Sequence, residues 1–245
     1  MVQSRALGAA TLRVVLALAL PAPLAAQQAS PSDTTTPPNT LSAAERAAGW
    51  KLLFDGKTTD GWRNYQADSI SHGWQVVHGE LTRVRPAGDI ITRDQYANFE
   101  LSLEWKISEG GNSGIFYRVS EDDSAAYWSG PEMQVLDDAR HPDGKSRLTS
   151  AGADYAIYPS PAGVVKPAGQ WNRVRIVVNG NHVEHWLNGV KVVDYELGSA
   201  DWEARVKASK FAPHVHYGRN ATGYIGLQDH GDQVAYRSIK IRVLP

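Results

Sequence analysis

The stretch FELSLEWKI, from Phe99 to Ile107, decides the fold, because its apolar and polar residues alternate without a break. Successive side chains of an extended chain point to opposite faces. This period of two therefore predicts a β-strand with one face in a core and one polar face. Similar short runs occur at 113–119, 132–136, 172–179, 182–187, 190–196, 223–229 and 235–243.

Turn residues connect several of these runs. Asn179-Gly180-Asn181 and Asn188-Gly189 lie between neighbouring strand runs and are strong hairpin signals. Many short strands joined by tight turns, without helices between them, are typical of antiparallel sheets. The sequence therefore predicts an all-β fold, an antiparallel β-sandwich or jelly roll.

The first 26 residues have the pattern of a signal peptide. They contain two arginines and no acid, an apolar run at 14–20, and small residues at Ala25 and Ala26. The apolar run is far shorter than the roughly 20 residues of a transmembrane helix, so no membrane span is expected. We predict that the mature protein is secreted or periplasmic.

Residues 27–41 are rich in Ser, Thr, Pro and Gln and predict a flexible linker. Ser42 followed by Glu45 forms a capping box that begins a short helix, which Gly49 ends. We expect the remaining chain, 42–245, to form a single domain, because its length suits one hydrophobic core.

Composition excludes several kinds of chemistry. The chain has no cysteine, which rules out disulfides, thiolate metal sites, a cysteine nucleophile and a lipid-bearing cysteine at the cleavage site. Its 25 basic residues nearly balance its 26 acidic ones, and they form no basic cluster. Nucleic acid is therefore not an expected partner.

Two segments combine an apolar face with an unusual polar face. In GPEMQVLDDARHPDG, residues 130–144, Glu132 and Gln134 share a face of the strand. In GLQDHG, residues 226–231, Gln228 and His230 do the same. Two such strands in one sheet would line a cleft for a polar ligand.

Five blocks of the chain resemble the family of 3-keto-disaccharide hydrolase domains, which has a concanavalin A-like lectin/glucanase fold. The blocks span nearly all of the chain beyond the expected linker. They are GWKLLFDGKTTDGW at 49–62, NFELSLEWKISEGGNSGIFYR at 98–118, GPEMQVLDDARHPDG at 130–144, GQWNRVRIVVNGNHVEHWLNG at 169–189 and GYIGLQDHGDQVAYRSIKI at 223–241.

The resemblance implies an enzyme that cleaves glycosides or disaccharides already oxidised at C3 of the sugar. A C3 ketone acidifies the proton on C2, whose removal gives an enediolate that expels the C1 substituent, with a hydrolysed or an unsaturated sugar as the product. The reaction needs a general base and an electrophile for the enolate oxygen. A divalent ion such as calcium, manganese or zinc would serve as that electrophile.

Four side chains on the polar faces are the first candidates for the site. His230 is expected to be the base or a metal ligand, since an unperturbed imidazole changes charge near neutral pH; the alternative is a histidine hydrogen-bonded at a strand end. Glu132 is expected to be a metal ligand or proton shuttle, the alternative being a solvated carboxylate. Gln134 and Gln228 would bind sugar hydroxyls, because an amide both donates and accepts.

Six further side chains are expected to contact the substrate. Trp128 would stack on a sugar ring, whereas most of the eight tryptophans should be core. Lys210 would be a counter-charge for the enolate or a plain surface lysine. A salt bridge across the sheet is the alternative for Glu104 and Arg118, and a backbone cap for Asp137. The six are Glu104, Arg118, Trp128, Asp137, His141 and Lys210.

Two other kinds of function compete with this one. An ordinary glucanase-type glycoside hydrolase would need two carboxylates about 5 to 9 Å apart, but the polar face of the key strand continues from Gln134 to Leu136 rather than to a second acid. A non-catalytic, lectin-like module would bind glycans on the same face, because jelly rolls host both enzymes and binders.

Overall fold

The computed structural model describes residues 1–2 and 36–245. The predicted signal peptide, apart from its first two residues, and the linker as far as residue 35 lie outside the described residues. Within the described part of the chain, no helix has both the length and the apolar character needed to cross a membrane.

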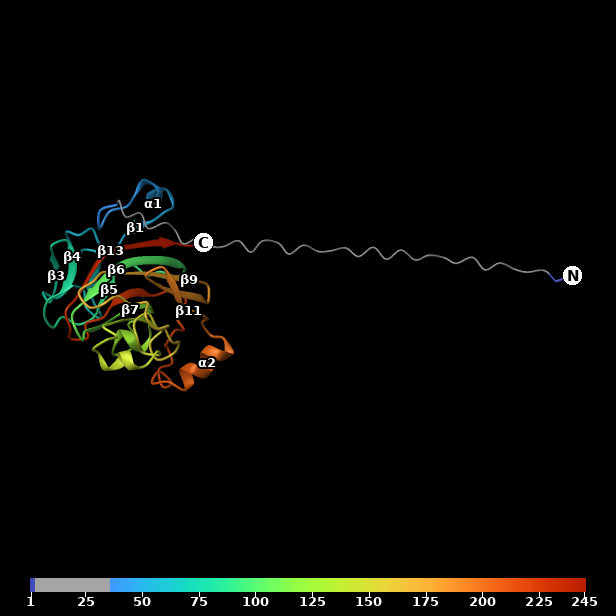
Figure 1. Ribbon diagram of the computed structural model, residues 1–245. Helices are drawn as coiled ribbons and strands as arrows, with labels where there is room; N and C mark the ends of the chain where they lie inside the picture. Colours follow the sequence, from blue (N-terminus) through green and yellow to red (C-terminus); the bar gives the residue numbers. More distant parts are fainter. Residues whose placement is uncertain (3–35) are drawn as a thin grey trace. The chain divides into compact units, whose positions relative to one another are not determined.

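Two antiparallel sheets form the domain, which confirms the predicted β-sandwich (Figure 1). The large sheet has the order β11-β10-β9-β6-β13-β4-β3, with β1 also paired to β13. Its strands are β1 (Lys51–Leu52), β3 (Trp74–Val77), β4 (Glu80–Arg83), β6 (Phe99–Ile107), β9 (Asn172–Asn179), β10 (His182–Leu187), β11 (Val190–Glu196) and β13 (Val234–Val243).

The small sheet has the order β2-β5-β12-β7-β8. It contains β2 (Trp62–Asn64), β5 (Ile90–Thr92), β7 (Asn112–Val119), β8 (Glu132–Leu136) and β12 (Tyr224–Leu227). Helices are few: α1 (Ala43–Ala47), α2 (Ala200–Lys207) and two 3-10 turns, η1 (Ala126–Trp128) and η2 (Pro142–Lys145). The capping box predicted for α1 is present, but α2, between β11 and β12, was not expected.

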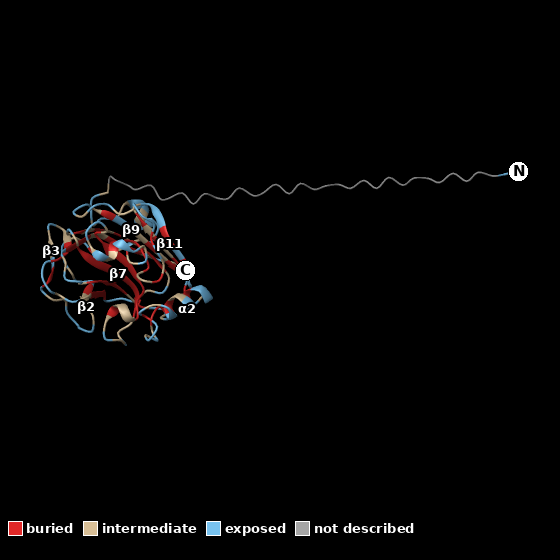
Figure 2. Cartoon of the chain, turned by 60° about the horizontal axis from the view of Figure 1, so that its bottom comes forward, coloured by how far each residue is buried: buried red, intermediate tan, exposed pale blue. Residues whose placement is uncertain are grey.

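The hydrophobic core lies between the two sheets. The alternating residues of β6 are almost completely buried there, and Leu103 is only 1% exposed. They belong to one cluster with Ile115 of β7 and Met133 of β8. Figure 2 shows these buried strands at the centre of the domain, under an exposed outer layer. The alternation of FELSLEWKI is thus satisfied by burial of one face, as predicted.

The end of the expected linker is attached to the domain. The backbone N–H of Ser238 donates to the side-chain oxygen of Asn39 at 2.8 Å, and the Asn39 amide donates to the carbonyl of Gly79 at 2.8 Å. Just beyond it, Glu45 of α1 pairs with Lys240 of β13. The boundary predicted at residue 41 is therefore too late, because Asn39 is already held against β13.

A non-strand segment, residues 152–155, covers the free edge of β8. The Gln134 N–H donates to the Ala153 carbonyl at 3.0 Å, and the Gly152 N–H donates to the Gln134 carbonyl at 2.8 Å. The Tyr155 N–H donates to the Glu132 carbonyl at 3.0 Å. This edge segment extends the small sheet and brings Tyr155 beside Glu132.

Candidate active site

The outer face of the small sheet carries a row of amides across three strands. Core packing of Ile115 and Met133 turns their neighbours Gly114, Glu132 and Gln134 to the outer face. Gly114 of β7 is paired with Gln134 of β8, and the Gln228 N–H donates to the Gly114 carbonyl at 3.0 Å. Gln228, Gly114 and Gln134 therefore lie in one row, which we call the amide row.

The amides of this row lack partners. Both side-chain polar atoms of Gln134 and the Oε1 atom of Gln228 are buried without a hydrogen bond to any described residue, and so is the Oδ1 atom of neighbouring Asn112. Gln134 is 1% exposed and Gln228 8%. A buried polar group left unpaired costs about 1 to 3 kcal/mol. Such groups are expected where a ligand or bound water completes them, and amides suit a ligand rich in hydroxyls.

Glu132 reaches over the middle of the amide row. A Cβ atom built on Gly114 would lie 2.1 Å from its Oε1 atom, so only glycine leaves room for this carboxyl group. The Glu132 side chain is buried and makes no hydrogen bond within the described chain. Burial raises the pKa of Glu132 to about 8; Lys210 opposes the shift, and Asp89, Asp154 and Asp143 add to it.

Lys210 supplies a positive charge beside Glu132. Its Nζ atom lies 4.2 Å from the centre of the Tyr155 ring and 5.1 Å from that of Phe211. The Tyr155 hydroxyl donates to Asp143 at 3.1 Å. Burial lowers the pKa of Lys210, while the carboxyl groups of Glu132 and Asp143 act in the opposite direction. Although the residue is exposed, its ammonium group faces the site, as one sequence hypothesis proposed.

Asp89 extends the amide row at its other end, and the sequence analysis missed it. Ile90 of β5 pairs with Leu227 of β12, so Asp89 lies opposite Gln228. Its Oδ1 atom accepts the backbone N–H of Asp229 at 2.9 Å. Burial raises the pKa of Asp89 to about 6, and the Asp229 charge adds to the shift. Its alternation with the buried Ile90 was the signal that could have revealed it.

Asp229 fixes the two loops that carry Asp89 and Gln228. Its carboxylate pairs with Arg83 at 2.7 Å, and both side chains are less than a tenth exposed. The same carboxylate accepts the N–H groups of Ala87 at 2.6 Å and Gly88 at 2.8 Å. The acid of the LQDHG segment is therefore a clamp between loops, which we call the Asp229 clamp.

His230 and His141 lie next to each other, with ring centres 6.3 Å apart. β12 ends at Leu227, so His230 lies in an exposed loop rather than on the strand predicted to reach 229. The Nδ1 atom of His141 accepts the Asp143 N–H at 3.1 Å, which assigns the proton of the neutral ring to Nε2. Within the described chain, no hydrogen bond joins His230 to Glu132.

Glu104 and Arg118 lie away from the amide row. Glu104 pairs with Arg237 at 2.7 Å and Arg173 at 3.2 Å on the outer face of the large sheet, on the other side of the sandwich. The Arg118 guanidinium donates to the carbonyl of Gly180 in the turn between β9 and β10. Strand alternation turns Glu104 to the large sheet and the turn at Gly180 holds Arg118, so the structure brings neither residue to the amide row.

Asp137 and Trp128 also have partners within the protein. Asp137 accepts the N–H groups of Gly110 at 2.7 Å and Ala139 at 3.2 Å, which is the backbone cap given as its alternative. The Trp128 ring is stacked on His214, with 3.7 Å between ring centres and 6° between planes. One face of the indole is thus occupied, which argues against the sugar stacking expected there.

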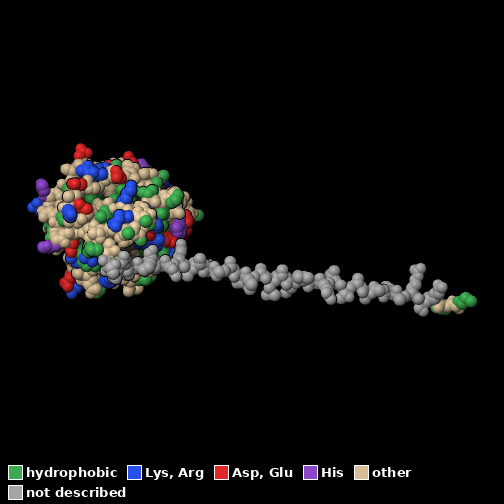
Figure 3. Space-filling model, turned by 90° about the horizontal axis from the view of Figure 1, so that it is seen from above, with side chains coloured by type: hydrophobic (Ala, Val, Ile, Leu, Met, Phe, Trp, Pro, Cys, Tyr) green, Lys and Arg blue, Asp and Glu red, His purple; other side chains and the backbone are tan. Residues whose placement is uncertain are grey.

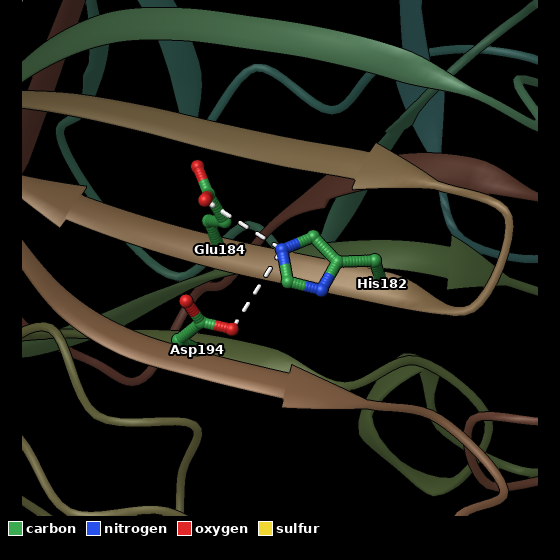
Figure 4. A group of neighbouring side chains, drawn as sticks. All are labelled: His182, Glu184 and Asp194. Atoms are coloured by element: carbon green, nitrogen blue, oxygen red, sulfur yellow. Dashed lines mark ion pairs between the residues drawn. The ribbon is translucent and has the colours of Figure 1, made fainter. Parts of the chain in front are cut away.

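A different cluster has the composition of a metal site. Figure 4 shows His182 and Glu184 of β10 facing Asp194 of β11, with the imidazole 3.6 Å from each carboxylate. This is the one group of three potential ligands among the residues that the structure describes. It lies on the outer face of the large sheet, and Lys191 already pairs with both carboxylates.

The divalent ion expected at Glu132 and His230 does not fit the groups around Glu132. Neither residue belongs to the group of three potential ligands. Amide oxygens and the Asp89 carboxyl group are near Glu132, but so is the Lys210 ammonium, whose positive charge would repel a divalent cation at this carboxyl group. The positive charge at this carboxyl group therefore comes from Lys210.

Comparisons with known proteins agree with the fold. A family model described as a 3-keto-alpha-glucoside-1,2-lyase-like domain matches residues 49–242, which include the amide row. A curated protein of Bacteroides thetaiotaomicron, named 3-keto-disaccharide hydrolase, is 36% identical over 230 residues, covering 81% of this chain and 79% of the relative.

Two crystal structures from Parabacteroides distasonis, both described provisionally as glycosyl hydrolases, have the same fold. One has a TM-score of 0.81 and 35% identity, and the match covers 85% of this chain and 100% of the other. The second has a TM-score of 0.62 and 30% identity, with 80% of this chain and 99% of the other covered.

Proposed function

The chain belongs to the family of 3-keto-alpha-glucoside-1,2-lyase-like domains, and from that membership we propose that it cleaves glycosides whose sugar carries a ketone at C3. It is an enzyme of the glycoside-cleaving class. The observation that carries the finer proposal is the buried Glu132 beside the Lys210 ammonium, over the middle of a row of unpaired amides.

Cleavage by elimination needs no oxocarbenium ion. A base takes the proton from C2, and the C–H electron pair forms the enolate of the C3 ketone. The enolate then collapses: the C3 carbonyl is restored, a C1–C2 double bond forms and the C1–O bond breaks with its electrons on the departing oxygen. Addition of water to C1 and a proton to C2 would convert the unsaturated sugar into the hydrolysed product. The protein must hold the sugar, move the proton and balance the enolate charge.

Glu132 is the group proposed to take the C2 proton. A carboxyl group with a pKa of about 8 is a stronger base than an ordinary carboxylate, and about a tenth of the molecules hold it ionised at pH 7. Its position over Gly114 would direct it at a sugar bound on the amide row. Lys210 is proposed to face the C3 oxygen, where its ammonium group would stabilise the enolate.

The amides bind and orient the sugar in this proposal. Gln134, Gln228 and Asn112 have unused polar atoms that suit hydroxyl groups, which both donate and accept. His141 can donate from Nε2, and His230 lies beside it, so this pair is proposed to contact the aglycone or an outer hydroxyl. Because the donor set at Glu132 does not suit a divalent ion, no step is assigned to a metal.

One observation favours a second function. The half-buried Asp89 is a second carboxyl group on the face of Glu132, as an ordinary glycoside hydrolase would require. The two functions differ in the oxidation state of the substrate. Exchange of the C2 proton with solvent occurs only in the first.

The test compares a 3-keto-glucoside with its parent glucoside, using the mature protein in deuterated buffer. We expect consumption of the 3-keto-glucoside with deuterium exchange or loss at C2, and no turnover of the parent. Glu132→Gln should lower kcat/KM at least about 100-fold. Glu104→Gln, on the opposite side of the sandwich, is the matched control and should leave it unchanged. Equal turnover of the two substrates would contradict the proposal, and tight binding without turnover would indicate a lectin.

A further inference from the structure

We propose that Asp89 is the acid that gives a proton to the departing glycosidic oxygen. This inference rests on the proposed function and assigns a residue to the step that Glu132 and Lys210 leave open. An elimination that releases a sugar or other alcohol expels an alkoxide, which is a poor leaving group. A positioned acid lowers the barrier to that step, typically by 100-fold to 10,000-fold in rate.

The strand register places Asp89 at one end of the amide row, whereas the Glu132 carboxyl group lies over the middle of the row. Asp89 lies opposite Gln228, and Gln228 bonds to Gly114, over which the Glu132 carboxyl group lies. Asp89 and Gly114 are thus two strand spacings apart, about 9 to 10 Å between backbones. A sugar ring bound on the amide row would then lie between the Asp89 and Glu132 carboxyl groups, in the manner of enzymes that cleave glycosides with paired carboxyl groups.

The surroundings of Asp89 and Glu132 differ in charge, and this difference assigns the roles of the two carboxyl groups. Lys210 lies on the Glu132 side of the site, where its ammonium group would face the enolate oxygen on C3. The proton to be removed is on C2, the neighbour of C3, so the base belongs on the same side. C1 and its departing oxygen lie on the other side of C2 and face Asp89.

The Asp89 carboxyl group is held so that one oxygen is available. Its Oδ1 atom accepts the Asp229 N–H, and its Oδ2 atom makes no hydrogen bond within the described chain. The Asp229 clamp, with Arg83 as its counter-ion, fixes this geometry. Burial is the main cause that favours the protonated form of Asp89; the hydrogen bond from the Asp229 N–H opposes it, and the Asp229 charge adds to it.

The step balances without another reactant. As the C1–O bond breaks, its electron pair passes to the glycosidic oxygen, and the proton on Asp89 Oδ2 moves to that oxygen. The aglycone leaves as a neutral alcohol and Asp89 remains as a carboxylate. The C2 proton stays on Glu132, and the sugar keeps its C1–C2 double bond until water adds.

The test uses Asp89→Asn and two substrates that differ in their need for an acid. A 4-nitrophenyl 3-keto-glucoside releases a stable phenolate, whereas a 3-keto-disaccharide releases a sugar alkoxide. We expect Asp89→Asn to lower kcat/KM at least about 100-fold for the disaccharide and less than about threefold for the nitrophenyl substrate. Glu132→Gln should lower both alike, and Asp194→Asn on the large sheet should change neither. Asparagine can still accept the Asp229 N–H, so the loop should keep its structure.

Wild-type protein gives a second measurement that needs no variant. The ratio of kcat/KM for the disaccharide to that for the nitrophenyl substrate should fall as pH rises above about 6, because Asp89 loses its proton while any dependence on Glu132 cancels in the ratio. The role of Asp89 is overturned if this ratio does not depend on pH. It is also overturned if Asp89→Asn lowers kcat/KM equally for both substrates or for neither. Failure of the wild type to cleave either 3-keto substrate overturns the proposed function itself.

Discussion

Replacing Glu132 by glutamine should stabilise the protein at alkaline pH while it removes activity. Glu132 is buried without a hydrogen bond, and burial raises its pKa from an ordinary 4.5 to about 8. Between these two values the folded protein holds a proton that the unfolded chain has lost. The free energy of unfolding therefore falls as pH rises through this window and is constant above it. Glutamine has nearly the same shape and carries no such proton.

The size of the effect follows from the two pKa values. At about 1.36 kcal/mol per pH unit, the span from 4.5 to about 8 corresponds to roughly 5 kcal/mol as an upper limit. The neighbouring Lys210 ammonium reduces this penalty because it stabilises the ionised form. We expect Glu132→Gln to gain at least about 1 to 2 kcal/mol relative to wild type between pH 5 and pH 9, within that limit.

Urea unfolding of both proteins at pH 5, 7 and 9 measures this difference. Glu104→Gln is the control, because Glu104 is paired with Arg237 and Arg173 on the opposite side of the sandwich. Its stability relative to wild type should not rise with pH. If Glu132→Gln gains nothing at pH 9, then Glu132 is ionised in the folded protein at no cost, and the reasoning from its burial is refuted.

Four other outcomes follow from the same geometry. Exhaustive chelation should leave turnover of a 3-keto-glucoside unchanged, because Lys210 supplies the positive charge; loss of turnover restored by a divalent ion would contradict this. Gly114→Ala should lower kcat/KM at least about tenfold at a stability cost of about 1 to 3 kcal/mol, since its Cβ would lie 2.1 Å from Glu132; unchanged kinetics would show that the carboxyl group moves freely. Leu103→Ala should lose about 2 to 5 kcal/mol in thermal or urea unfolding and keep its activity per folded molecule; reduced specific activity would link the core to the site. His230→Gln should lower kcat/KM less than about tenfold, because the residue is exposed beyond the end of β12; a loss of 100-fold or more would restore it as the base.

Strand periodicity predicted the parts of the site that lie on regular strands. Alternation in FELSLEWKI predicted β6, and alternation in EMQVL predicted that Glu132 and Gln134 share a face. The same rule found Gln228 but failed two residues later, because the strand ends at Leu227. Side chains alternate between the two faces of a sheet only as far as the backbone hydrogen bonds of the strand continue.

The remaining site residues come from loops, where sequence carries no such rule. Asp89 precedes a strand of three residues, and its place beside Gln228 depends on the pairing of β5 with β12. Tyr155 reaches Glu132 through the edge segment, and Lys210 follows a helix that the pattern did not predict. Local sequence could name Asp89 and Lys210 as candidates, but non-local pairing decides which residues become their neighbours.

Charge is distributed on the surface much as the composition suggests. Figure 3 shows acidic and basic side chains interspersed over the face that it displays. Their numbers in the full chain are nearly equal.

The edge segment also protects the protein against self-association. The unpaired backbone groups of an edge strand can template pairing with another chain, and β8 has the apolar sequence EMQVL. Residues 152–155 form hydrogen bonds with the backbone groups of β8 at Glu132 and Gln134, so these groups cannot pair with a second molecule. The terminal strand of the large sheet, β11, instead carries Lys191, Asp194 and Glu196, charges that oppose stacking of like edges. The contacts that hold Tyr155 beside Glu132 thus also cover this sheet edge against pairing with another molecule.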